Sequence, residues 1–330
     1  MLIKLKQTWV FLILSFWSNS LSSSPSRSIE TLSHFFLSLE NSSDSQRCPP
    51  RAPLADEEEL LLFYDIQQNP FADEPGTEST LHNAPGHYEA CQKLNYCIEE
   101  ELPVGVLTAP NGMGRGLVLQ QLIQTLTPGT YSGVTTTIEP GINDRAFLKN
   151  LLYELGVIDI FRKDSSIHHL AKLLQQTVVE KYAKEGVRLI LCFAEAQNMS
   201  FKIFSLLQWL VNIEVSHKKM ITVLLAGDPD LHTKLQQKGM EFLTNRIYAS
   251  VSLDPLTPAE TEEYLHSKLS LAHFKQKIFS QAAAQIIFSA STGIYREINT
   301  LAHTALIRAF ELKKKSIDQA IMLSCLEDDR

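Results

Sequence analysis

Short apolar runs alternate with longer amphipathic segments through the middle of the chain. The apolar or β-branched runs cover residues 104–108, 133–138, 187–193, 220–226 and 248–253. Between them, apolar residues recur every three or four positions, as they do on one face of a helix. Strands that alternate with helices predict a parallel sheet with helices on both faces, so we expect an α/β fold.

Capping and breaking residues mark the helix boundaries. Asp144 is placed to cap a helix that Gly156 ends, and a longer helix is expected from about Ser166 to Gly186. These helices connect neighbouring strands of the predicted sheet.

The pattern changes beyond Pro255, where only helical spacing remains. Thr257 is placed to cap a first helix and Ser316 a short last one, with two more helices over residues 279–289 and 296–312. We therefore expect a small helical domain after the sheet.

The first apolar run leads into a loop of alternating glycines, residues 109–117. A phosphate-binding loop has Gly, four residues, Gly, Lys and then Ser or Thr; its backbone N–H groups and Lys hold phosphates, and its hydroxyl holds Mg²⁺. Ala109, Arg115 and Gly116 stand at three of these positions, while Gly114 keeps the second glycine. The candidate nucleotide contacts in the loop are Ala109, Asn111, Gly112, Met113, Gly114, Arg115, Gly116 and Leu117.

A second candidate motif follows the apolar run 187–193. In phosphate-loop ATPases the corresponding strand ends in two acidic residues, one supporting Mg²⁺ and the next orienting the attacking water. Here Ala194 stands at the first position and Glu195 at the second. Glu195 is therefore a candidate catalytic residue; the alternative is a solvated carboxylate at a strand end.

In this order the motifs resemble the AAA+ ATPases of the general secretion pathway protein A (ExeA) type, which are related to transposition-helper ATPases. The resemblance runs from about Tyr64 to the C-terminus. Besides the two motifs above, its matching parts are the opening motif Asn69-Pro70-Phe71, the sensor-1 segment 225–231 with Asp228, the segment 245–247 with Arg246, and the signature 293–299 with Arg296.

The resemblance implies an AAA+ sheet domain over residues 56–254 and a helical lid over residues 255–330, with ATP between them. It also implies a role for Arg246 as an arginine finger in a neighbouring subunit's site and for Arg296 as sensor 2. The implied assembly is a homo-oligomer, or a mixed ring with an intact AAA+ paralogue, and its partner is secretion machinery or a membrane-associated protein. A DNA ligand stays open.

The departures from the family pattern fall on one network. Arginine is a larger planar fork than lysine, Gly116 has no hydroxyl, Ala194 has no carboxylate, and Asp228 adds negative charge near the expected terminal phosphate. We therefore expect weak ATP binding, little support for Mg²⁺ and poor or no hydrolysis. The alternatives are an active ATPase that drives secretion-machinery assembly or transposition, and a nucleotide-independent interaction module.

Composition narrows the chemistry further. The net charge of -7 argues against a broadly basic nucleic-acid surface, and the lysine run 313–315 is best explained as a solvated helix end. The five cysteines form no CxxC pair and no zinc-like cluster, so we predict reduced thiols and no metal site. His168, His169 and the other histidines are expected at the surface.

Residues 1–55 begin with Lys4 and Lys6, an apolar run over residues 9–17 and a Ser-rich tract, the order of a signal peptide. The run is shorter than the ~20 residues of a membrane span. Three explanations stay open: a real signal or anchor, a membrane-associating tail, or an upstream start foreign to the fold. Because export conflicts with the use of ATP, we expect a cytoplasmic protein, with inner-membrane association as the next alternative and export as the less favoured one.

Overall fold

The computed structural model describes residues 57–66, 68–71, 85–158, 166–274 and 277–328. All described residues belong to one compact unit, Ala55–Arg330. The signal-like segment therefore lies outside the described residues. Within them, no helix combines the length and the apolar character needed to cross a membrane.

Five parallel strands form the central sheet, as the apolar runs predict. Their order is β2 (Tyr131–Thr137), β3 (Arg188–Ala194), β6 (Ile221–Gly227), β1 (Val104–Thr108) and β7 (Ile247–Ser252). Every residue of β1 and β6 is buried, whereas the edge strands β2 and β7 are largely half-buried or exposed. The continuous apolar runs are thus the strands that have neighbours on both sides.

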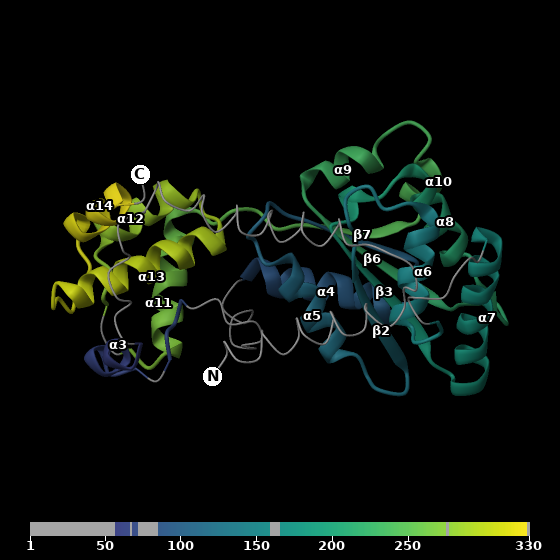
Figure 1. Cartoon of the computed structure of the whole chain (residues 1–330), viewed down its shortest axis with the longest axis horizontal. Helices are drawn as coiled ribbons and strands as arrows, with labels where there is room; N and C mark the ends of the chain where they lie inside the picture. The colour runs from purple at the N-terminus through teal and green to yellow at the C-terminus, as the bar shows by residue number, and fades with distance from the viewer. Residues whose placement is uncertain (1–56, 67, 72–84, 159–165, 275–276, 329–330) are drawn as a thin grey trace, which may run out of the picture. The chain divides into compact units, whose positions relative to one another are not determined.

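Helices cover both faces of the sheet (Figure 1). On one face lie α4 (Pro85–Glu99) and α5 (Arg115–Thr125), and on the other lie α6 (Asp144–Glu154), α7 (Ile167–Glu185) and α8 (Phe201–Val211). Each face has its own hydrophobic core.

The two cores are supplied by alternate residues of the same strands. Leu191 and Val223 join the core under α6, α7 and α8, whereas their chain neighbours Cys192 and Leu224 join the core under α4 and α5. This alternation follows from the two-residue period of a strand. Cys192 is a buried free thiol, as the sequence predicts.

Shorter elements complete the sheet part. The 3₁₀ helix η2 (Ala196–Asn198) follows β3, while α9 (Pro229–Leu235) follows β6 and α10 (Glu241–Thr244) precedes β7. Between α8 and β6 lies a two-stranded hairpin, β4 (Glu214–Val215) and β5 (Lys218–Lys219), which the hydrophobic pattern does not reveal.

A third core belongs to the helical part of the chain. It joins α11 (Pro258–Leu271), α12 (Gln281–Ser291), α13 (Tyr295–Glu311) and α14 (Gln319–Asp328) to α3 (Glu57–Tyr64). The helix that comes before the sheet in the sequence therefore packs with the helices that come after it (Figure 1).

The residues around Asn69-Pro70-Phe71 extend this core. The ring of Phe71 is 2% exposed and meets the ring of Phe279 edge-on, with 5.9 Å between centroids. The side chain of Asn69 accepts a hydrogen bond from the backbone N–H of Phe71 at 3.0 Å and contacts His303 of α13. The motif thus fastens the N-terminal end of the described chain to the helical part.

Two of the predicted helix caps are wrong by one or two residues. Asn143, not Asp144, caps α6, because it directly precedes the first turn and accepts from the N–H of Ala146. Asp318, not Ser316, accepts from the N–H of Ile321 at the start of α14. In contrast, Thr257 caps α11 as expected and forms a capping box with Glu260.

Replacing Phe71 by Ala should destabilise the helical part by about 3–5 kcal/mol, because it removes a buried ring from a closed core. Chemical denaturation of the full chain, followed by circular dichroism, measures this loss. Leu62→Ala on α3 is the matched control, since this side chain is 81% exposed and its loss should cost less than about 0.5 kcal/mol. Equal losses in the two variants would contradict the packing described here.

Candidate functional site

The glycine loop joins the carboxyl end of β1 to the start of α5. Gly112 and Gly114 both have φ of 83°, a conformation that favours glycine. A Cβ added at Gly112 would lie 2.8 Å from Cγ2 of Ile294, and one at Gly114 would lie 2.7 Å from Nε2 of His87. Gly116 differs, because nothing lies within 4 Å of an added Cβ there. The loop keeps the glycines that its shape requires, and at Gly116 it has room for a side chain.

Arg115, at the lysine position, folds back into the loop. Its Nη1 donates to the backbone oxygen of Ala109 at 2.6 Å, and its Nη2 donates to Oδ1 of Asn111 and to Oε1 of Glu195, both at 2.8 Å. The residue is only 8% exposed. The structure thus brings the two candidate motifs into direct contact through an ion pair between Arg115 and Glu195.

Glu195 is held from a second side. Its other carboxylate oxygen, Oε2, accepts from Nε2 of Gln197 at 2.7 Å, and Oε1 of Gln197 accepts from the backbone N–H of Asp228 at 3.2 Å. The φ of 56° at Glu195 is unusual for a residue with a side chain. A chain of polar contacts therefore links the glycine loop, the end of β3 and the end of β6.

Asp228 lies between the end of β6 and the start of α9. Its carboxylate caps α9 by accepting from the backbone N–H of Asp230 at 3.0 Å. This contact gives Asp228 a structural role in the site.

The other loop residues divide into buried and exposed groups. Ala109 and Met113 are buried in the core under α4 and α5, whereas Asn111 is exposed and Leu117 is half-buried. The backbone N–H of Leu117 donates to the oxygen of Gly114 at 3.0 Å in the first turn of α5. The buried residues Ala109 and Met113 therefore hold the glycine loop against the core, and Asn111 faces solvent.

The two positions that would support Mg²⁺ carry no oxygen-bearing side chain. Mg²⁺ prefers oxygen ligands, and neither Gly116 nor Ala194 supplies one. Among the described residues, no group of three or more His, Cys, Asp or Glu side chains lies close enough to hold a metal ion. These residues therefore do not fit a metal held as in an intact phosphate-loop ATPase.

The two candidate arginines outside the loop lie in different settings. The backbone N–H of Arg296 donates to the oxygen of Gly112 at 3.1 Å, so α13 begins against the glycine loop, and the Arg296 side chain is exposed. The guanidinium of Arg246 donates to the backbone oxygen of Phe242 and lies 3.4 Å from Oδ1 of Asn212. The structure brings Arg296 to the loop, whereas Arg246 is bound to Phe242 of the preceding helix α10 and to Asn212, which follows α8.

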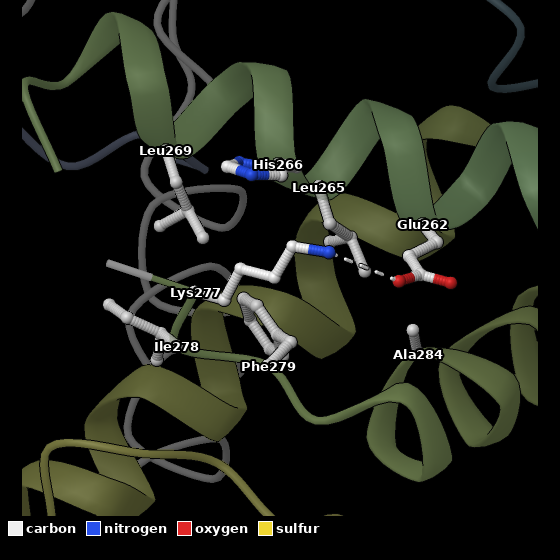
Figure 2. Close-up of a pocket in the computed structure, with 8 residues that line it drawn as sticks. All are labelled: Glu262, Leu265, His266, Leu269, Lys277, Ile278, Phe279 and Ala284. Carbon is white, nitrogen blue, oxygen red and sulfur yellow. Dashed lines mark ion pairs between the residues drawn. The ribbon is translucent and has the colours of Figure 1, made fainter. Parts of the chain in front are cut away.

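A separate small hollow of about 20 Å³ lies in the helical part (Figure 2). Figure 2 shows Lys277 reaching along its rim toward Glu262 of α11, and the two charged groups are 3.7 Å apart. Leu265, Leu269 and Ile278 supply apolar lining. The hollow includes no residue of the glycine loop, so it is not part of the candidate nucleotide site.

His87 is a site residue that the sequence analysis missed. Histidines were expected at the surface, but His87 is 4% exposed, and its Nε2 lies 2.6 Å from the backbone oxygen of Met113. A carbonyl oxygen only accepts, so Nε2 carries the proton. Its ring also meets that of Tyr295 at 4.9 Å. The available signal was helical spacing, since His87 lies three and seven residues before the buried Ala90 and Leu94.

Burial lowers the pKa of His87 below its usual value of 6.5, and its Nδ1 has no partner among the described residues. Burial also raises the pKa of Tyr295 to about 12, so that ring stays neutral. The unfolded chain then binds a proton near pH 6 that the folded chain does not. The folded state should therefore lose stability as the pH falls below about 6.5.

Replacing His87 by Gln should remove this part of the pH dependence, which amounts to at most about 1.4 kcal/mol per pH unit for one proton. Urea denaturation between about pH 7.5 and about pH 5.5 measures it, with the wild-type chain losing more stability than the variant. His168→Gln is the control, because His168 is exposed. Identical pH profiles for the wild type and His87→Gln would contradict the assignment.

A family described as an AAA domain matches residues 99–235. General secretion pathway protein A of Aeromonas hydrophila is 29% identical over 248 residues, which make up 75% of this chain and 44% of that protein. The chain therefore spans less than half the length of this relative.

Solved structures share the fold at low identity. ORC2 of Aeropyrum pernix, solved with ADPNP and ADP, matches with a TM-score of 0.58 at 13% identity, over 79% of this chain and 71% of ORC2. Cdc6p of Pyrobaculum aerophilum matches with a TM-score of 0.58 at 18% identity, over 76% and 68%. ORC of Drosophila, bound to DNA, matches with a TM-score of 0.58 at 14% identity, over 90% and 73%. The chain thus has the phosphate-loop fold seen in AAA+ proteins, matches an AAA domain over residues 99–235 and is similar to general secretion pathway protein A.

Proposed function

We propose that this protein is an AAA+ module that binds ATP weakly and hydrolyses it poorly or not at all. The observation that carries the proposal is the absence of an oxygen-bearing side chain at both positions that would support Mg²⁺, Gly116 and Ala194. The surrounding strand, loop and helix keep the geometry of a phosphate cradle. The fold of an ATPase is thus retained while its metal support is lost.

The size of the expected loss of ATP turnover follows from the chemistry of phosphoryl transfer. A metal ion contributes several kcal/mol to the stabilisation of the transition state, and about 1.36 kcal/mol corresponds to a tenfold change in rate. Losing this support should lower turnover by orders of magnitude. Binding should suffer less, because backbone N–H groups at the start of α5 still attract phosphate.

We further propose that the module acts through assembly, as a homo-oligomer or in a mixed ring with an intact AAA+ paralogue. Arg246 supports this proposal, since it stands in the segment 245–247 that resembles the arginine-finger segment of the family, and its guanidinium is half-buried on the sheet part. The similarity to general secretion pathway protein A favours secretion machinery at the cytoplasmic side of the inner membrane as the partner. The net charge of -7 favours a protein partner, with DNA as the alternative.

Calorimetric titration of the full chain with ATP, with and without Mg²⁺, tests the proposal together with a phosphate-release assay on the same sample. We expect weak binding that Mg²⁺ does not strengthen, and no phosphate release above background. Mg²⁺-dependent turnover that Glu195→Gln abolishes would instead show an active ATPase. No binding at all would favour a nucleotide-independent interaction module.

Restoring the missing oxygen ligands should create a Mg²⁺ response. The double variant Gly116→Thr/Ala194→Asp adds a hydroxyl and a carboxylate, and the space at Gly116 admits the new side chain. We expect Mg²⁺ to strengthen ATP binding about tenfold in this variant, a change of about 1.4 kcal/mol. Gly116→Val/Ala194→Asp is the matched control, because valine has the shape of threonine without its hydroxyl. A Mg²⁺ response of equal size in the control would contradict the role given to residue 116.

A further inference from the structure

We propose that Arg115 is an internal occupant of the phosphate site, and that ATP must displace its guanidinium from Glu195 and Asn111 in order to bind. This inference rests on the proposed function, since it explains why binding is weak. It reverses the role that the resemblance implies for this position: the side chain competes with the phosphates instead of holding them.

The hydrogen bonds of one nitrogen carry the argument. Nη2 of Arg115 has two hydrogens, and both are engaged, one by Oδ1 of Asn111 and one by Oε1 of Glu195. Nη1 donates to the backbone oxygen of Ala109 inside the loop. A phosphate oxygen can reach Nη2 only by replacing Asn111 or Glu195. The fork shape of arginine makes these simultaneous contacts feasible, whereas a lysine nitrogen is a single compact point.

Electrostatics favours the occupied arrangement. Arg115 is the first residue of α5, where the helix dipole disfavours a positive charge, and its side chain is only 9% exposed. The carboxylate of Glu195 supplies the negative charge that this buried cation requires. In a site that holds nucleotide, phosphate would supply that charge. Glu195 therefore supplies to Arg115 the negative charge that a bound phosphate would otherwise supply.

The network behind Glu195 keeps the carboxylate in position. Gln197 donates to its second oxygen and accepts from the backbone N–H of Asp228. Both oxygens of Glu195 thus have partners, so the carboxylate is fixed toward Arg115. An incoming phosphate would have to separate this pair and would then lie beside an unpaired carboxylate.

Weakening either partner of Nη2 should therefore strengthen ATP binding. We expect Glu195→Gln to bind ATP about tenfold more tightly than the wild type. This factor applies if the Arg115 guanidinium has left Glu195 in about one wild-type molecule in ten. Asn111→Ala should gain about threefold, because it removes a neutral partner. Asn111 is exposed, so this variant tests the idea without disturbing the core. Titration of the full chain with ATP in EDTA measures the affinity while preventing hydrolysis.

Glu139→Gln is the matched control, since it removes an exposed carboxylate that lies just beyond β2. Its affinity for ATP should equal that of the wild type. A second readout is thermal unfolding: Glu195→Gln should melt below the wild type without ATP, and ATP should raise its melting temperature more.

Affinity that is unchanged or lower in both Glu195→Gln and Asn111→Ala would overturn the inference and make Arg115 a ligand of phosphate. That result would leave the proposed function standing if the wild type still binds weakly. Tight, Mg²⁺-dependent binding by the wild type would overturn the proposed function, whatever the variants do.

Discussion

The burial of β1 on both faces of the sheet is the constraint on which the site depends. A strand with no exposed residue needs helices on both sides, and parallel strands need connections that leave from the same edge. The chain therefore turns at Ala109, Glu195 and Asp228, which follow the carboxyl ends of β1, β3 and β6 on the same side of the sheet. Residues that are far apart in the sequence meet there because of the sheet order.

At the carboxyl ends of these strands, the arginine at position 115 changes which groups the site offers to a ligand. A lysine would present one nitrogen to a ligand, whereas Arg115 forms three hydrogen bonds with its own chain. The loop keeps its left-handed glycines, and Met113 is buried beneath it. Under the proposed function, the loop backbone favours phosphate while the Arg115 side chain competes with it, because a fold does not by itself fix a reaction.

The sequence predicts much of this architecture because the relevant signals are local. Apolar runs mark the strands, and a capping box at Thr257 marks the start of α11. The pairing of Arg115 with Glu195 is not local, since 80 residues separate the two. The sequence shows that an arginine stands at position 115 in place of the family's lysine, but it does not show which side chain pairs with that arginine.

Other features escaped prediction for different physical reasons. The burial of His87 depends on a carbonyl of the glycine loop, which only the fold brings near it. The hairpin before β6 has strands of two residues, too short for a period to be seen, and its turn places Ser216 and His217 at positive φ. Asn143 and Asp144 are both good caps, and the choice between neighbours depends on where the first turn begins.

The packing of α3 sets a limit on how the chain can be shortened. Leu60, Tyr64, Ile66 and Phe71 precede the sheet, yet they fill a core whose other buried members all follow it. The sheet part is in this sense inserted into the helical part, whose helices come from both before and after the sheet in the sequence. Any cleavage that removes the signal-like segment must therefore fall before Glu57, because a later cut would leave the helical core open to water.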